Sequence, residues 1–269
     1  MARSLAVREA ANTYAQLRLA HPDAHCELLH ANAFQLLVAV VLSAQTTDVA
    51  VNQLTPALFR RWPGPDALAR ADVPMVEQAL SRIGMFRQKA KNITRLAQKL
   101  VEEHGGEVPR SLEALMELPG VGRKTANCVL GVAFGTAVGV VVDTHVQRLA
   151  QRLGWSRRKT PEHIETDLMR IFPQTDWPML AHTLIFHGRR VCTARSPQCL
   201  GCPVASRCPS AFKAERVGRK PPKSPRVVAS AAPVLDKAKA KTRAKAPLPT
   251  RRASADSERG ASRRPRSSV

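Results

Sequence analysis

The sequence predicts an all-α protein, and three observations support that prediction. Segments of helical periodicity follow one another through residues 1–215 and are separated by proline and glycine. Phe34–Ser43 is apolar nearly all round, as expected of a central buried helix. The only segment that looks extended is Val138–Val142, which is too short to require a sheet.

Further helices are predicted in order along the chain. The alanine, leucine and arginine periodicity around Glu9 fits a first helix. Amphipathic spacing predicts helices over Asp72–Ser81, Lys89–His104 and Glu162–Ile171. Ser111–Leu118 is predicted as a short helix with its first residue as the N-cap, since a serine hydroxyl accepts a bond from a free backbone N–H.

Basic residues outnumber acidic ones, but they are unevenly distributed along the chain. The formal charge of the 269 residues is +21. Residues 216–269 hold 16 Lys and Arg and 3 Asp and Glu, a net of +13, which leaves +8 for residues 1–215. A basic body favours binding to a polyanion such as nucleic acid, although a merely soluble basic surface has the same charge.

Composition changes at residue 216, where Lys, Arg, Ala, Pro and Ser begin to dominate. Such a segment buries too little apolar surface to offset its chain entropy, so residues 216–269 are predicted to be a disordered basic tail. Two functions fit it equally: a non-specific DNA tether acting through counterion release, and a solubilising extension.

Membrane and secretory classes are excluded by the sequence pattern. No apolar run approaches the roughly 18 residues that span a bilayer, and the N-terminus lacks the apolar core of a signal peptide. We therefore expect a cytoplasmic protein with no membrane partner. Structural disulfides are not expected among its six cysteines in that compartment.

Leu118–Gly122 lies between two helical patterns and predicts a tight turn. Pro119 ends the first helix, while Gly120 and Gly122 leave the backbone bare. The second helix then begins with free N–H groups and the positive end of its dipole, which together suit a phosphate oxygen. An ordinary corner between two helices would have the same glycines and proline.

Lys124 follows this turn, and its direction can be deduced from the second helix. The apolar stripe of that helix is Ala126, Val129, Leu130 and Ala133. At about 100° per residue, Lys124 lies roughly 170° from the centre of the stripe, so it points away from the packing surface. A cation in the first turn opposes the dipole, which favours the neutral, nucleophilic amine over the ammonium form. An exposed lysine is otherwise a solvated charge.

Four cysteines close to one another predict a metal site. Cys192, Cys199, Cys202 and Cys208 have the spacing C-x6-C-x2-C-x5-C. Four thiolates ligate either a zinc ion or a [4Fe-4S] cluster, and the residue types do not separate the two. The other two cysteines, Cys26 and Cys128, are expected to be buried apolar residues.

Arginines surround the cysteine segment. They are expected to offer guanidinium groups to phosphates, and Arg195 is predicted to contact DNA. The full set is Arg189, Arg190, Arg195 and Arg207.

Several of these motifs together resemble the endonuclease III family of helix-hairpin-helix DNA glycosylase/AP lyases. Residues 118–126 are similar to the family's hairpin, and Val142–His145 is similar to its catalytic aspartate segment. Leu42–Asp48 resembles the loop that places a glutamine in the gap left by a flipped nucleotide. The cysteine spacing is similar to that of the family's [4Fe-4S] cluster, so the resemblance, which spans about residues 5–212, favours iron.

The resemblance implies roles for individual residues. Lys124 would attack C1′ of the damaged nucleoside and form a Schiff base, after which β-elimination cleaves the strand 3′ to the abasic site. Asp143 would stabilise positive charge on the sugar or move protons. Its other interpretation is an N-cap for the helix beginning at Thr144, and both roles can coexist. Gln45 would fill the hole in the duplex and Met85 would act as an apolar wedge, where a core methionine would look the same.

The resemblance also implies an architecture and a context. Residues 26–137 would form a helical bundle bearing the hairpin, residues 1–25 plus 138–215 an iron–sulfur cluster domain, and the active site would lie between them. The partner would be double-stranded DNA containing oxidised pyrimidines or abasic sites. The protein would be a monomer in the bacterial cytoplasm, associated with the nucleoid.

Two rival functions fit less well. An adenine-specific mismatch glycosylase relative would lack the lysine nucleophile and would carry a glutamate on the early helix, yet no glutamate occurs between Glu27 and Glu77. A non-catalytic helix-hairpin-helix DNA-binding protein would need neither Lys124 nor Asp143.

Overall fold

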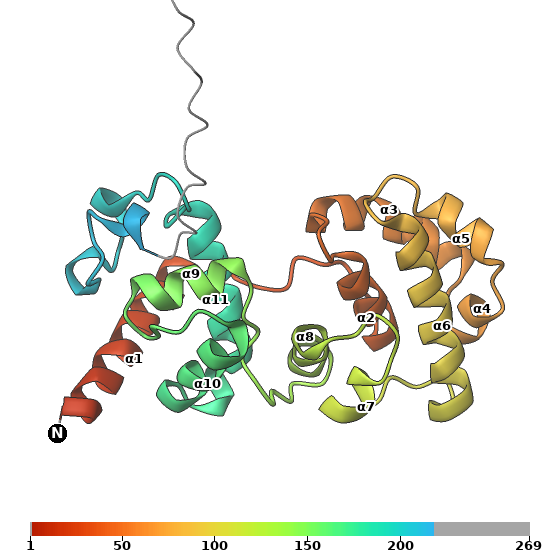
Figure 1. The fold of residues 1–269 in the computed structure, drawn as a ribbon, viewed down its shortest axis with the longest axis horizontal. Coiled ribbons are helices and arrows are strands. Elements are labelled where there is room, and N and C mark those ends of the chain that lie inside the picture. The colour runs from red at the N-terminus through yellow and green to blue at the C-terminus, as the bar shows by residue number, and fades with distance from the viewer. Residues whose placement is uncertain (1, 218–269) are drawn as a thin grey trace, which may run out of the picture. The chain divides into compact units, whose positions relative to one another are not determined.

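The computed structural model describes residues 2–217, and the side chains of residues 6–217. This part of the chain contains eleven α-helices, four short 3-10 helices and no strand, which confirms the predicted all-α class (Figure 1). Residues 218–269, which hold nearly all of the predicted basic tail, lie outside the described residues. The carbonyl of Val217 accepts a hydrogen bond from Arg152 Nε at 3.1 Å, so the packed part extends slightly past the predicted boundary.

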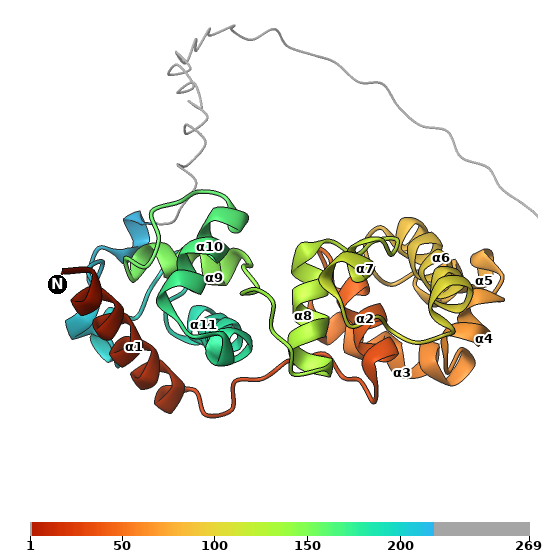
Figure 2. The ribbon, with the colours of Figure 1, turned by 90° about the horizontal axis from the view of Figure 1, so that it is seen from below.

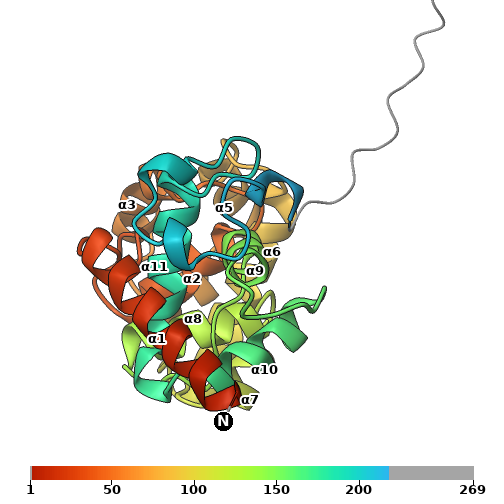
Figure 3. The same ribbon diagram turned by 90° about the vertical axis from the view of Figure 1, so that its left-hand side faces the viewer.

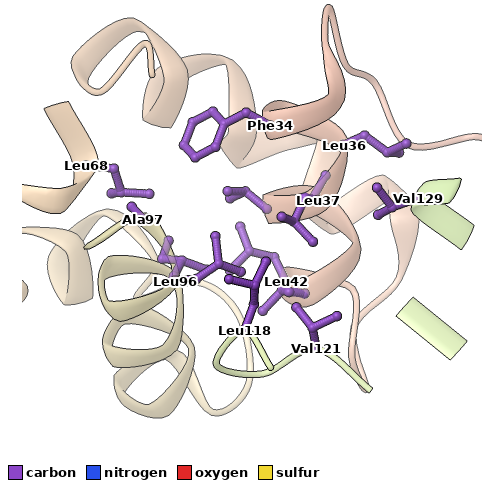
Figure 4. Close-up of a cluster of buried hydrophobic side chains, with 14 of the residues drawn as sticks. Phe34, Leu36, Leu37, Leu42, Leu68, Leu96, Ala97, Leu118, Val121 and Val129 are labelled. Carbon is purple, nitrogen blue, oxygen red and sulfur yellow. The ribbon is translucent and has the colours of Figure 1, made fainter. Parts of the chain in front are cut away.

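One hydrophobic core belongs to a set of helices that we call the hairpin lobe. Its helices are α2 (Ala33–Leu42), α3 (Asp48–Arg61), α4 (Pro65–Ala69), α5 (Val73–Ala79), α6 (Phe86–His104), α7 (Leu112–Met116) and α8 (Arg123–Ala133). The predicted central helix is α2, in which seven of ten residues are buried. It packs against both α6 and α8, and Leu37 and Leu42 point into the cluster that also holds Leu96 and Leu118 (Figure 4).

A second core belongs to what we call the cysteine lobe. Its helices are α1 (Ala2–Ala20), α9 (Thr144–Arg152), α10 (Pro161–Ile171) and α11 (Trp177–Arg190), followed by the short 3-10 helices Cys199–Gly201, Ala205–Arg207 and Ala214–Arg216. Helix α1, at the N-terminal end of the chain, packs on α10 and α11, which come much later in the sequence (Figure 3). The chain therefore begins in this lobe, builds the hairpin lobe and returns. Both lobes belong to one compact unit.

The helix boundaries follow local chemistry. Ser111 accepts a hydrogen bond from the backbone N–H of Ala114 at 3.3 Å, which confirms it as the predicted N-cap of α7. Helix α5 is shorter than predicted. Asp72 is its N-cap, and the helix ends at Ala79 with Leu80 as the C-cap. Helix α6 begins earlier than predicted, at Phe86, because the backbone reverses at Met85 in the left-handed region with φ of 56°.

Val138–Val142 links the two lobes and forms no strand. Val138 packs against the core of the hairpin lobe, whereas Val140 and Val142 are buried in the core of the cysteine lobe. The apolar run thus reflects a segment that passes from one core to the other, which Figure 2 shows between α8 and α9. Among the described helices, none combines the length and apolar character needed to cross a bilayer.

Candidate active site

The predicted turn between α7 and α8 is present, and glycine stands at its two positions for different structural reasons. Gly120 has a φ of +81°, and a Cβ there would lie 2.9 Å from Asn92 Nδ2, so both backbone and space require glycine. Gly122 is the N-cap of α8 in extended conformation, and a Cβ there would meet nothing within 4 Å. The first turn of α8 is consequently open to an approaching ligand.

Helix α8 turns Lys124 away from the core, as predicted. Ala126, Val129 and Leu130 are buried, Ala133 is half-buried, and Lys124 is exposed. Its side chain lines a cavity of about 350 Å³. The apolar stripe therefore fixes the rotation of the helix, and the amine faces the cavity rather than a packed neighbour.

Both lobes contribute to this cavity, which we call the catalytic cavity. Lys124 and Asp143 both line it, and so does Gln45. Met85, Arg195, Gly120 and Gly122 do not line it. The structure thus brings Lys124, Asp143 and Gln45 together, and it leaves Met85, Arg195 and the two hairpin glycines outside the cavity. Further polar residues of the wall are Glu27, Asp48, His182 and Arg189.

Asp143 caps helix α9, as the alternative interpretation proposed. Its Oδ1 accepts hydrogen bonds from the backbone N–H groups of His145 and Val146, both at 2.8 Å. Within the described residues its Oδ2 accepts no hydrogen bond from protein. One oxygen therefore fixes the carboxylate at the helix N-terminus, and the other stays available in the catalytic cavity.

Asp48 is a half-buried carboxylate in the same wall that the sequence pattern did not single out. Burial raises its pKa, with nearby Asp143 acting in the same direction and Lys124 opposing it. Arg189 Nη2 donates to its Oδ2 at 3.0 Å, and the same guanidinium binds Glu27. Position alone gave no signal for it, because an aspartate at the start of α3 looks like a helix-dipole residue.

Gln45 and Met85 share an unusual backbone. Their φ angles are 55° and 56°, in the left-handed region, and both side chains are exposed. Such a conformation costs a non-glycine residue about 1–3 kcal/mol and persists only where neighbours enforce it. One such neighbour is Lys89, which is 4% exposed and donates to Thr46 Oγ1 at 2.6 Å. The loop that carries Gln45 is therefore anchored from α6.

Three of the four arginines near the cysteines form ion pairs with carboxylates. Arg189 binds Glu27 and Asp48, Arg190 binds Asp23 at 2.7 Å, and Arg207 binds Glu9 at 2.7 Å. Of these four arginines, Arg195 alone is exposed without a carboxylate partner among the described residues. Three of the four arginines expected to offer their guanidinium groups to phosphates are thus paired with carboxylates far away in sequence, and their contact with phosphates stays a prediction.

The four predicted metal ligands line one further cavity, in the cysteine lobe. Its wall is otherwise largely apolar, with Leu149, Leu153 and Val204 among the lining residues. Burial raises the pKa of the Cys202 and Cys208 thiols, so cations are needed to hold them as thiolates. No three of the described His, Cys, Asp and Glu side chains lie close enough to hold a single ion.

Arg152 is an unpredicted support of this site. It is fully buried, and its Nη1 donates to Cys192 Sγ at 3.2 Å and to the Thr193 carbonyl at 2.8 Å. Nη2 donates to the Ala194 carbonyl at 3.0 Å. The sequence gave no sign of this role, because an arginine in the last turn of a helix usually lies at the surface.

Comparison with known proteins agrees with this geometry. Residues 38–174 match the model of the HhH-GPD superfamily base excision DNA repair proteins, and residues 192–208 match the iron-sulfur binding domain of endonuclease III. The endonuclease III of Synechocystis sp. is 52% identical over 195 residues, which cover 72% of this chain and 89% of the relative.

Two solved structures are similar in fold as well as sequence. A non-covalent endonuclease III–DNA complex has a TM-score of 0.74 and 43% identity, covering 78% of this chain and 98% of the other. A trapped endonuclease III–DNA covalent intermediate has a TM-score of 0.72 and 44% identity, covering 76% and 96%.

Fold and site together define a helix-hairpin-helix base excision repair enzyme. The chain belongs to the endonuclease III family of DNA glycosylases with AP lyase activity. Its cofactor is a [4Fe-4S] cluster, and the residues that fit it are the four cysteines of the cysteine lobe.

Proposed function

We propose that the chain removes oxidised pyrimidines from double-stranded DNA and cleaves the strand at the resulting abasic site, with Lys124 as its nucleophile. The observation that carries this proposal is the presence of Lys124 and Asp143 in one cavity built by both lobes. An amine and a carboxylate are the two groups that displacement of a base through a Schiff base requires.

In this mechanism Lys124 Nζ attacks C1′ and the base leaves with the glycosidic electron pair. Asp143 Oδ2 faces the positive charge that develops on the sugar, while Oδ1 remains fixed by its two backbone bonds. The carboxylate then assists the proton transfers that open the sugar ring and lead to β-elimination. Fixing one oxygen limits the reorganisation needed during these steps.

Chemistry at C1′ of a duplex requires the nucleotide to leave the stack, at a cost of a few kcal/mol. Gln45 and Met85 are the residues proposed to replace it, and both side chains are exposed, which supports this proposal. Gly120, Gly122 and Arg195 are proposed phosphate contacts. The open first turn of α8 supports the hairpin contact. The exposed guanidinium of Arg195, which pairs with no carboxylate of the described residues, supports the other.

The mismatch-specific alternative has less support. Glu27 lines the catalytic cavity, but it lies before α2 rather than on that helix, and Arg189 binds its carboxylate. The helix itself, Ala33–Leu42, contains no glutamate.

We also propose that the protein acts as a monomer in the bacterial cytoplasm, associated with the nucleoid. The catalytic cavity is complete within one chain, which supports the monomer. The bacterial relatives and the basic charge support the location. The [4Fe-4S] cluster would hold the cysteine segment in place and so position Arg195.

The lesion preference is tested with a panel of duplexes that each contain one defined damaged base. Base release and strand cleavage are measured separately for the holoenzyme. We expect release and cleavage with oxidised pyrimidines, and cleavage alone with a preformed abasic site. Release of adenine from a mismatch without cleavage would instead support the mismatch-specific alternative.

A further inference from the structure

Cys128 lies in the catalytic cavity, on the same face of α8 as the proposed nucleophile. It follows Lys124 by four residues, which is one helical turn, and both side chains line the cavity. The thiol is half-buried rather than enclosed in the core. The expectation that Cys128 is only a buried apolar residue is therefore incomplete.

Cys26 reaches the same cavity from a different part of the chain. It belongs to the segment between α1 and α2, which is held by Asn52 of α3 through two hydrogen bonds, from Leu29 N–H at 2.9 Å and to the Glu27 carbonyl at 2.7 Å. Cys26 is half-buried, and it lines the catalytic cavity together with Cys128, whose side chain interacts with its own. Two thiols far apart in sequence thus meet beside Lys124.

The two thiols are chemically unequal. The hydrogen bond from Cys128 lowers the pKa of Cys26 to about 7, and a backbone bond at Leu28 adds to this effect. The same interaction and burial raise the pKa of Cys128. Near neutral pH, Cys26 is therefore a substantial thiolate beside a protonated partner, which is the arrangement of an attacking thiol and a resolving thiol.

We propose that Cys26 and Cys128 are a reversible oxidation site, in which a low-molecular-weight disulfide converts the two thiols to a protein disulfide that slows turnover in the catalytic cavity. The effect on turnover rests on the proposed function of that cavity. Other described cysteines are the four that fit the cluster, so this pair is the one left for thiol exchange.

The chemistry balances in two exchanges. The Cys26 thiolate attacks one sulfur of the external disulfide, forms a mixed disulfide and releases one external thiolate. Cys128, after losing its proton to that thiolate, attacks the Cys26 sulfur, forms the protein disulfide and releases the second external thiolate, which takes up a proton from water. Two protein thiols are oxidised and one external disulfide is reduced to two thiols.

The Cys26–Cys128 disulfide would change the position of Lys124. A disulfide holds its sulfur atoms about 2.0 Å apart, closer than two hydrogen-bonded thiols. Because Asn52 anchors the Cys26 segment, α8 has to move towards it, or the segment has to give way. Displacing an attacking group by about 1 Å costs about a hundredfold in rate, so even a smaller shift of Lys124 is measurable.

The test uses the full-length holoenzyme and oxidised glutathione as the external disulfide. After oxidation under anaerobic conditions, free thiols are alkylated and peptides are analysed by mass spectrometry. We expect a Cys26–Cys128 linked peptide, with the visible absorbance of the cluster unchanged. Cleavage of abasic-site DNA should fall by about tenfold and recover with dithiothreitol.

Cys26→Ala and Cys128→Ala provide the controls. In each variant the ratio of the oxidised to the reduced rate should stay near one, and this ratio does not depend on the variant's own activity. Alkylation of both wild-type thiols after oxidation overturns the oxidation site. A linked peptide with an unchanged rate overturns its effect on turnover. Failure of the proposed function is recognised separately, because reduced protein would then form no lysine adduct with DNA.

Discussion

Glu165 of α10 accepts two hydrogen bonds from the guanidinium group of Arg123, from Nε at 2.8 Å and from Nη2 at 3.1 Å. Asn127 Nδ2 donates to the same carboxylate at 2.9 Å. Arg123 and Asn127 flank Lys124 on α8, so a buried carboxylate of the cysteine lobe holds the first turn of the hairpin lobe's last helix. A Cβ at Gly139 would collide with Glu165, which explains the glycine there. We infer that Glu165 positions Lys124.

Glu165→Gln should weaken the contacts with Arg123 and Asn127, although the glutamine side chain has nearly the same shape as glutamate. A neutral amide forms weaker bonds with Arg123 and leaves a buried donor poorly matched, so we expect the free energy of unfolding to fall by about 1–3 kcal/mol. Strand cleavage should slow at saturating DNA, because Lys124 loses its fixed position. Glu162→Gln, an exposed change on the same helix, is the matched control. Equal unfolding curves and rates for the two variants would remove the positioning role.

The two hairpin glycines should respond differently to alanine. Gly120→Ala places a side chain at φ of +81° against Asn92, so it should cost about 1–3 kcal/mol of stability. Gly122→Ala meets open space and should unfold like wild type. It should nevertheless weaken binding to abasic-site DNA by about tenfold, the loss expected for one bond from a backbone amide to a charged oxygen. Normal affinity in Gly122→Ala would place the phosphate elsewhere.

Met85→Asn separates strain from function. Asparagine tolerates the left-handed region, so stability should stay constant or rise, while the apolar side chain is lost. Excision of a damaged base, which requires flipping, should slow by about tenfold, and cleavage at a preformed abasic site should slow less. Met75→Asn, at another exposed methionine, is the control. If both substrates are affected alike, Met85 is not a wedge.

Arg152→Lys should loosen the cysteine segment. Lysine cannot reproduce the bonds to Cys192 Sγ and to the Thr193 and Ala194 carbonyls, so the holoenzyme should lose iron about tenfold faster to a chelator. Iron content and visible absorbance measure this without reference to activity. Arg190→Lys changes an exposed ion pair and should retain iron normally. If both variants lose iron at the same rate, Arg152 does not support the cluster site.

Local patterns predicted much of this molecule. Periodicity marked the main helices, a serine marked the start of α7, and the apolar stripe of α8 gave the direction of Lys124, because each depends on residues within a few turns. Contacts between distant segments were not predictable in this way. Glu165 with Arg123 and Asp48 with Arg189 join residues whose proximity depends on how the two lobes pack. Cys26 with Cys128 joins two distant segments within the hairpin lobe. The arginine pairs show the consequence, since three guanidinium groups expected at phosphates are bound to carboxylates.

The proposed covalent bond to DNA is formed by Lys124. Borohydride added during turnover on DNA containing an oxidised pyrimidine should trap a protein–DNA adduct, and peptide mapping should locate it at Lys124. Lys124→Ala should give no adduct, whereas Lys159→Ala, which removes an exposed charge outside the catalytic cavity, should give the wild-type amount. Base release by wild type without any trapped adduct, or an adduct that maps to another amine, would contradict the account.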